Sequence, residues 1–597
     1  MGPYRESRVI CNPVVRLLVV ITAILGAGHS LALAQHDLPV GGTPHLVFST
    51  YLGGSTPCED CSDARTFAQN AGTDAQGNTY VTGATKVSDL PVLNAWQDKP
   101  AAHSTMSAFV AKYDAAGKLL WCTYLGGNKE SMGVGVAVMP DGGVAVAGQT
   151  KSIAPGPFPT LNAYRDTNSG HSDYFVTVFD ANGTVRYSTY LGGSGVEGEG
   201  GVFTDDNSNG NNIAVDAQGL VYVTGTTASG SSEAIKFPVT PNAIQTDLRG
   251  PTDAFLSIID PTKSGTDSLV YSSFLGGDRE EKGHGVAVNA TGSQVTAVGY
   301  TKSFDFPTTP NAYRSHSAPP GYISNGFVTQ IESSNPGSPS SLYTMRYSTY
   351  LGADSKDARD DTYAVALDPR GLIATTGRTM SADFPMNPDG HSIYNSAPYL
   401  KPGLSNDQPY LVKIDPSLEG KASLAYSTFL GGAGFCTGVA VDTRGNAWVA
   451  GETSAEGVEY APSPYPVESP REFPYTQDAL ITSYQGSLDG ILMQTNAGGT
   501  MLSYSTYFGG KGNDRSYGLA VDPAGNVVVT GLTSSRDFPL KNPAQTWPGG
   551  EQNAFVARFA PSSPQPIPAM NSWGESLLFL ILAGASVWKI RRRWQGR

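Results

Sequence analysis

The residues best suited to chemistry are two groups of carboxylates in long segments between expected strands. The segments span residues 194–212 and 354–362, and their acidic side chains are Glu197, Glu199, Asp205, Asp206, Asp354, Asp357, Asp360 and Asp361. Carboxylates gathered in this way could bind a cation, calcium above all because it prefers oxygen ligands, or a basic partner. Neither segment has the D-x-D-x-D-G ligand ladder of a calcium loop, so solvated loops are the simpler interpretation and the cofactor stays unknown.

Catalytic motifs are absent from the sequence. It contains no G-x-S-x-G elbow, no H-E-x-x-H and no phosphate-binding loop. The histidines occupy unrelated segments, except that His284 lies beside an expected channel-facing strand. A pair of carboxylates for glycoside cleavage remains open, because a fold can bring together acids that are distant in sequence. No catalytic residue is therefore assigned, and a non-enzymatic role is favoured.

Five cysteines are present, and Cys11 lies in the N-terminal leader. Cys58 and Cys61 form a single C-x-x-C, and no second ligand pair at zinc-site spacing accompanies it. A local disulfide is the favoured interpretation for an exported protein. We expect Cys122 and Cys436, which fall in or next to strands, to be buried thiols.

The amino-acid composition limits which fold classes and which partners are plausible for this chain. The 597 residues include 70 glycines, and only 15% are charged, against about 25% charged residues in a typical domain. Frequent glycines with many aromatics and few charges favour short strands joined by tight turns. The formal net charge of −13 repels phosphate backbones, so nucleic acid is excluded as a partner.

Four motifs recur seven times each along the chain. They are Y-S-T-Y-L-G-G, V-T-G, an apolar residue followed by Pro, and D-A-F-V, each with close variants. Every unit contains four strand-like runs. In the second unit these are residues 133–139, 144–148, 174–179 and 185–191. Repeats of this kind predict an all-β protein of seven four-stranded units.

The two ends of the repeat region predict a closed ring. The region begins on a fourth-strand motif at 46–54 and ends on a third-strand motif at 553–559, so neither end is a complete unit. Pairing these strands would complete the seventh unit and leave no open sheet edge at either end. The sequence therefore predicts a seven-bladed β-propeller over residues 46–560, closed by the N-terminal strand.

The combination YSTYLGG, AVD-x-x-G-N, V-T-G-x-T, F-P and P-N-A-Y resembles the SBBP family of bacterial β-propeller repeats. The resemblance covers most of the chain, with Ala353 in place of one motif glycine. It implies an exported propeller and no particular activity.

Both ends of the chain carry expected targeting segments. Residues 1–34 resemble a signal peptide, with arginines, a short apolar run and Ala32-Leu33-Ala34. Residues 35–45 are expected to be a short linker, and residues 561–566 a Pro/Ser linker. Residues 567–597 resemble the IPTL-CTERM sorting signal of Gram-negative bacteria. The matching residues are Ile567, Pro568, Trp573, Gly574, Arg591, Arg592 and Arg593. The resemblance implies a processing or sorting enzyme as a partner. It also implies an inner-membrane anchor before processing, and then a location at the cell surface or outside the cell.

Strand alternation in a propeller divides the loops between two rims. The long fourth-to-first and second-to-third connections share one rim, where binding by variable loops is expected. The repeated F-P is expected to fill the gap between blades. The favoured function is binding or display of a protein, glycan or matrix component through this rim. The alternative is a polysaccharide hydrolase or lyase with carboxylates at the channel mouth.

Overall fold

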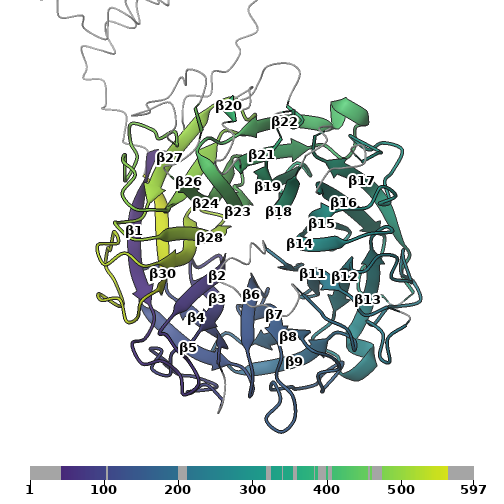
Figure 1. The fold of residues 1–597 in the computed structure, drawn as a ribbon, viewed down its shortest axis with the longest axis horizontal. Coiled ribbons are helices and arrows are strands. Elements are labelled where there is room, and N and C mark those ends of the chain that lie inside the picture. Colours follow the sequence, from purple (N-terminus) through teal and green to yellow (C-terminus); the bar gives the residue numbers. More distant parts are fainter. Residues whose placement is uncertain are drawn as a thin grey trace, which may run out of the picture. The chain divides into compact units, whose positions relative to one another are not determined.

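The computed structural model describes residues 42–101, 105–198, 211–230, 232–317, 324–338, 340–353, 359–381, 383–386, 399–400, 407–454, 458–459 and 473–562. Over these residues the chain forms seven four-stranded antiparallel sheets arranged as blades of a ring (Figure 1). The predicted all-β, seven-bladed propeller is confirmed.

Each blade is a simple up-and-down sheet whose first strand lies nearest the centre (Figure 1). Blade 1 contains β2 (Thr66–Thr73), β3 (Thr79–Thr85), β4 (Ser107–Tyr113) and β5 (Leu119–Leu125). Blade 2 contains β6 (Ser131–Val138), β7 (Val144–Thr150), β8 (Asp173–Phe179) and β9 (Val185–Leu191). Blade 3 contains β10 (Ile213–Val215), β11 (Val221–Thr227), β12 (Asp253–Ile259) and β13 (Leu269–Leu275). Blade 4 contains β14 (Glu281–Val288), β15 (Gln294–Thr301), β16 (Asn325–Ser333) and β17 (Tyr343–Leu351).

The remaining blades follow the same order. Blade 5 contains β18 (Asp360–Leu367), β19 (Ile373–Thr379), β21 (Gln408–Ile414) and β22 (Leu424–Phe429). Blade 6 contains β23 (Ala433–Val441), β24 (Ala447–Ser454), β26 (Asp489–Thr495) and β27 (Leu502–Phe508). Blade 7 contains β28 (Asp514–Val521), β29 (Val527–Thr533), β30 (Asn553–Ser562) and β1 (Gly42–Leu52). Outside the blades lie the short pair β20 (Tyr399–Leu400) and β25 (Val458–Glu459), and the 3-10 helices η1 (Gly265–Ser268) and η2 (Gly420–Ser423).

The ring closes through the N-terminal strand, as predicted. The strand order in blade 7 is β1-β30-β29-β28, so the first strand of the chain is the outermost strand of the last blade. The two closing strands begin and end slightly outside the predicted 46–560. No helix among the described residues has the length and apolar character needed to cross a membrane. The expected signal peptide and sorting tail lie outside the described residues.

The F-P motifs fill the spaces between blades. Phe158 is buried and stacks on Phe175 of β8, with ring centroids 4.3 Å apart. The backbone N–H of Phe158 donates to the Tyr190 hydroxyl (2.8 Å), which donates in turn to the carbonyl of Ser152 (3.1 Å). A Tyr of the fourth strand thus ties the motif to its own blade, and the same contacts recur around Tyr124 and Tyr350. This bears out the packing role expected for F-P.

The D-x-x-G motifs form the turns between the first two strands of a blade. Asp216 Oδ1 accepts the backbone N–H groups of Gln218 and Leu220, both at 2.9 Å. Gly219 has a φ of +84°, a conformation in which a side chain would be strained. The carboxylate therefore stabilises the turn.

In blade 3 two separate stretches of the chain pair with β11. Glu197 pairs with Thr227, the register position at which other first strands begin, and Ile213 to Val215 pair with Val223 to Val221. The amide of Asn211 donates to the carbonyls of Val286 and Val365 (3.2 and 2.7 Å) and accepts the Val365 N–H (3.0 Å). Asn211 thus links the first strands of blades 4 and 5 across the channel.

Candidate functional site

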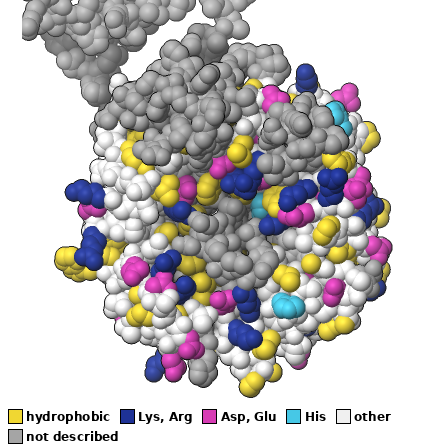
Figure 2. Space-filling view, viewed as in Figure 1, with side chains coloured by type: hydrophobic (Ala, Val, Ile, Leu, Met, Phe, Trp, Pro, Cys, Tyr) yellow, Lys and Arg dark blue, Asp and Glu magenta, His cyan; other side chains and the backbone are white. Residues whose placement is uncertain are grey.

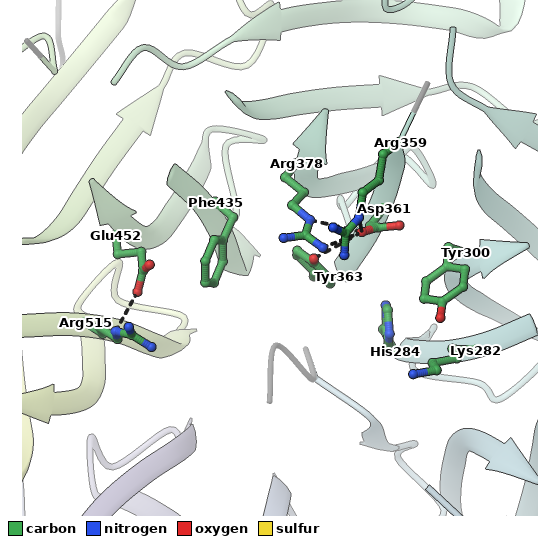
Figure 3. Close-up of a pocket in the computed structure, with 10 residues that line it drawn as sticks. All are labelled: Lys282, His284, Tyr300, Arg359, Asp361, Tyr363, Arg378, Phe435, Glu452 and Arg515. Carbon is green, nitrogen blue, oxygen red and sulfur yellow. Dashed lines mark hydrogen bonds and ion pairs between the residues drawn. The ribbon is translucent and has the colours of Figure 1, made fainter. Parts of the chain in front are cut away.

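One register level at the mouth of the central channel carries large polar and aromatic side chains. The second or third residue of a first strand pairs there with the residue that follows the glycine of the V-T-G motif. In blades 4 to 7 the pairs are Lys282 with Tyr300, Asp361 with Arg378, Phe435 with Glu452 and Arg515 with Leu532. All of these except Leu532 line one cavity of about 430 Å³. His284, Arg359 and Tyr363 complete the lining (Figure 3).

β-Bulges bring His284 and Tyr363 into this cavity. The register of β14 shifts between Gly283 and Gly285, and that of β18 shifts between Thr362 and Ala364, so one residue of each strand is left unpaired. A bulge turns its extra residue out of the ladder. The two rings contact each other, with centroids 5.2 Å apart. His284 Nδ1 lies 2.9 Å from the Thr362 carbonyl oxygen, which connects blade 4 to blade 5.

A buried ion-pair cluster forms one wall. Asp361 Oδ2 lies 2.9 Å from Arg378 Nη2 and 3.4 Å from Arg359 Nε. Burial opposes ionisation of Asp361. The charges of Arg378 and Arg359 and a hydrogen bond from Ser324 outweigh that effect and lower the pKa of the carboxyl. Asp361 is therefore a fixed anion that orients two guanidinium groups toward the cavity.

The opposite wall carries a second ion pair. Arg515 Nε lies 3.1 Å from Glu452 Oε2, as the dashed line in Figure 3 marks. Phe435 lies between the two ion pairs in that view. Near Lys282, the hydroxyl of Tyr300 donates to Glu280 Oε1 (2.6 Å). The cavity is thus lined by four cations and two carboxylates, with Asp407 3.5 Å from Arg378 and Glu280 beside Lys282 at its edge.

On the side of blades 7, 1 and 2 the same level carries mainly apolar side chains, with Gln149 of blade 2 as a polar exception. A closed cluster there includes Phe67, Met132, Val134, Tyr517 and Leu532, all buried. The channel mouth therefore has one apolar half and one charged half, and only the charged half contains this cavity. Figure 2 shows several Lys and Arg side chains near the centre of this face.

The structure places three of the eight predicted acidic site residues. Glu197 and Asp360 are fully buried where blades meet, and Asp361 is buried in β18 beside the cavity. These three carboxylates therefore lie inside the ring instead of in solvated loops. The other five, Glu199, Asp205, Asp206, Asp354 and Asp357, lie outside the described residues. So do the predicted sorting residues Ile567, Pro568, Trp573, Gly574 and Arg591 to Arg593.

The described residues include four cysteines and were also compared with the geometry that a metal site requires. Cys58 and Cys61 are joined by a disulfide, with Cα atoms 5.0 Å apart, and Cys122 and Cys436 are free and buried. Within the described ranges no group of three or more His, Cys, Asp or Glu side chains is placed to hold a metal ion.

Most cavity residues were not predicted from the sequence, although the repeats contain a clue to them. The position after the V-T-G glycine holds Ala84, Gln149, Thr226, Tyr300, Arg378, Glu452 and Leu532 in the seven blades. Large aromatic or charged residues thus stand together in blades 4, 5 and 6. Comparing the repeats column by column would have shown this grouping. Of the residues singled out beforehand, His284 and Asp361 line the cavity.

Comparison with known protein families identifies one of the repeats. Residues 503–539, which span β27 to the F-P motif of blade 7, match the model of SBBP, described as a beta-propeller repeat. The chain carries an SBBP repeat. Among curated proteins it is similar to the regulatory protein FlaEY of Caulobacter vibrioides, with 27% identity over 221 residues. That match covers 37% of this chain and only 20% of FlaEY.

Comparison with solved structures gave matches of low similarity. One is a protein of unknown function from Dyadobacter fermentans, with 10% sequence identity and a TM-score of 0.37, covering 88% of this chain and 100% of that chain. Another is the quinohemoprotein alcohol dehydrogenase ADHIIG of Pseudomonas putida, with 11% identity and a TM-score of 0.35, covering 89% and 79%. Likeness at this level says nothing about the chemistry of the channel mouth.

Proposed function

We propose that this SBBP-repeat propeller is an exported, envelope-associated binding protein that holds an anionic glycan at the charged half of its channel mouth. The observation that carries the proposal is the cavity lined by Lys282, Arg359, Arg378 and Arg515 in an otherwise acidic chain. Acidic surroundings repel anions in general, so a local group of cations is the place on such a chain where an anion would bind. Arginine is well suited to carboxylates because its planar fork can donate two parallel hydrogen bonds.

The size and the rings of the cavity favour a carboxylated sugar. A volume of about 430 Å³ is in the range of small-molecule sites, roughly 300–1,000 Å³. Phe435, Tyr300 and Tyr363 supply aromatic surface beside the cations. In addition, Trp96 and Trp547 are exposed, at 42% and 78%, in the second-to-third connections of neighbouring blades 1 and 7. Exposed aromatics on the long-loop rim are what a glycan-binding or protein-binding face would present.

Export and cellular location are also part of the proposal. The N-terminal segment and the tail at 567–597 favour export, anchoring in the inner membrane and subsequent processing by a sorting enzyme. The Cys58–Cys61 disulfide is consistent with an oxidising compartment.

The enzymatic alternative is less well supported by the cavity. A glycoside hydrolase needs a carboxylic acid whose pKa is raised so that it can protonate the leaving group. Asp361 has a lowered pKa, and Glu452 is paired with Arg515. A lyase acting on uronates would instead need a base near the bound carboxylate. His284 and Tyr300 line the cavity, so they are the side chains to replace in a test of lyase activity.

Isothermal titration of the full chain with a uronic-acid oligosaccharide tests the proposal. We expect binding that weakens as salt is raised, and no binding of a neutral oligosaccharide of equal length. The double variant Lys282→Gln, Arg359→Gln should bind at least about tenfold more weakly, because each lost charge contact contributes on the order of 1 kcal/mol. Lys151→Gln is the control, since Lys151 lies in blade 2 and pairs with Glu130.

Three results would change the assignment. Equal binding of the oligosaccharide by the wild type and the double variant would refute the cavity as the site. Binding of a glutamate-rich peptide in place of the oligosaccharide would keep the site and replace the glycan by an acidic protein. An unsaturated uronate product in the same solution would support the lyase alternative.

A further inference from the structure

Buried acids face each other at several seams between neighbouring blades. One acid begins the third strand of a blade, and the other begins the first strand of the next blade. Such pairs are Asp173 with Glu197, Asp253 with Glu281 and Asp489 with Asp514, and all six side chains are buried. Each pair lies beside the first glycine of a Y-L-G-G motif. A Cβ on Gly509, for example, would lie 2.7 Å from Asp514 Oδ2 and 3.0 Å from Asp489 Oδ1.

Two of these pairs have carboxylate oxygens without a hydrogen bond of normal geometry, although the Gly193 N–H lies near Glu197 and the Thr533 hydroxyl lies near Asp514. Asp173 Oδ2 accepts the Ser169 N–H (2.8 Å), and Glu197 Oε1 accepts the hydroxyls of Thr227 (3.0 Å) and Ser229. The remaining atoms, Asp173 Oδ1 and Glu197 Oε2, are buried without a donor. The two carboxyl groups interact directly with each other.

The seam between blades 6 and 7 has a similar arrangement, in which the negative charge of Asp514 opposes ionisation of Asp489. Asp489 Oδ2 accepts the Gln485 N–H (2.8 Å), and Asp514 Oδ2 accepts the Gly510 N–H (2.7 Å) and the Ser535 hydroxyl (2.6 Å). Asp489 Oδ1 and Asp514 Oδ1 are buried without a donor. In contrast, every carboxylate oxygen of Asp253 and Glu281 accepts a hydrogen bond.

Two ionised carboxylates facing each other in a buried seam would repel each other and leave both oxygens unsatisfied. One proton placed between them removes the repulsion and gives each oxygen a partner. We propose that the Asp173–Glu197 and Asp489–Asp514 seams each hold one shared proton, so that the ring is most stable at mildly acidic pH and loosens as the pH rises.

Other charged groups around the seams are few. Arg165 favours ionisation of Asp173, and its guanidinium donates to the carbonyl of Gly192 and the hydroxyl of Ser169. Asp537 opposes ionisation of Asp514. Tyr190 and Tyr51 lie beside the two seams, and burial raises the pKa of each hydroxyl, so neither loses its proton in the relevant range.

The direction of the pH effect follows from the acids themselves. Burial, together with the facing carboxylate, raises the pKa of Glu197 to about 8 and that of Asp489 to about 7. In the unfolded chain such groups titrate near pH 4. The folded protein therefore holds more protons than the unfolded chain between about pH 4 and pH 8. Its stability is fully present below that window and is lost as the pH rises through it.

The sequence supplies a natural substitution for the test. At the seam between blades 7 and 1, Asn553 occupies the position of Asp173 and Asp489, and its Oδ1 accepts the Gly549 N–H (2.8 Å). The variant Asp173→Asn, Asp489→Asn should therefore keep the loop hydrogen bonds while its amide N–H groups replace the shared protons. The control Asp114→Asn, Asp180→Asn removes two charges at exposed turns.

The measurements use the full chain. Unfolding by urea in weakly buffered solution at pH 6.5 should release about two more protons from the wild type than from the Asp173→Asn, Asp489→Asn variant, one for each seam. The Tm of the wild type and of the control should fall between pH 5 and pH 8.5, and that of the seam variant should fall less. Equal proton release and equal pH slopes in all three would overturn the proposal. If the seam variant fails to fold, release of less than about one proton by the wild type would overturn it.

Discussion

Arg558 offers a direct test of how the ring is closed. This residue lies on β30, the strand that pairs with the N-terminal β1. Its Nη2 donates to Asp522 Oδ2 of the same blade (2.8 Å), and its Nη1 donates to the carbonyl of Gly77 in blade 1. Both members of the ion pair are buried, with side-chain exposures of 6% and 4%. Replacing Arg558 by Met removes the contact across the closing seam and leaves Asp522 buried without its cation.

The expected loss can be worked out from this geometry. Removing one partner of a buried ion pair costs about 3–5 kcal/mol. The ring spans roughly 520 residues, and an unfolding entropy of about 2.1 cal/mol/K per residue gives about 1.1 kcal/mol/K. The Tm of Arg558→Met should therefore fall by about 3–5 °C if the ring unfolds as one unit.

Differential scanning calorimetry of the full chain measures this shift. The control is Arg536→Met, since Arg536 lies in the same blade and is exposed, and its Tm should change by less than about 1 °C. Lys413→Met should behave like Arg558→Met, because Lys413 is buried between Asp368 of its own blade and the Gly445 carbonyl of the next. An unchanged Tm for Arg558→Met, with a lowered Tm for Lys413→Met, would refute the idea that the closing seam is held like the others.

Two further substitutions test the packing and the channel. Phe158→Ala removes a buried ring between blades and should lower the free energy of unfolding by about 3–5 kcal/mol, as measured by chemical denaturation; a loss below about 1 kcal/mol would contradict the packing role of the F-P motif. Asn211→Ala removes three hydrogen bonds that join β14 to β18 and should cost about 1–3 kcal/mol. It should also speed amide hydrogen exchange at Val365, and unchanged exchange there would contradict the link.

The fold could be predicted because the repeat encodes it locally. Most blades share the turn aspartate, V-T-G and F-P or a close variant of each, and each motif has one structural task, as Asp216 and Phe158 illustrate. Ring closure could also be predicted, because the repeat region begins and ends on strands of the same blade. These features depend on neighbours along the chain or on the next blade, and sequence spacing specifies both.

The site could be predicted only in part, because it depends on which blades face one another across the channel. Asp361 was singled out as one member of an acidic loop, but its role follows from Arg378 on the next strand and from Arg359. Glu197 looked like a solvated carboxylate, yet it is buried where it pairs with Thr227 of β11, and it interacts with Asp173. Burial of a charged side chain depends on its partner in space, and local sequence does not reveal that partner.

The most direct test of the binding proposal is a crystal structure of the protein grown with the uronic-acid oligosaccharide at saturating concentration. The proposal predicts density for a sugar carboxylate within hydrogen-bonding distance of Arg359, Arg378 or Arg515, with the sugar ring against Phe435 or Tyr363. An empty cavity, with the oligosaccharide bound elsewhere on the ring, would contradict the claim that the charged half of the channel mouth is the binding site.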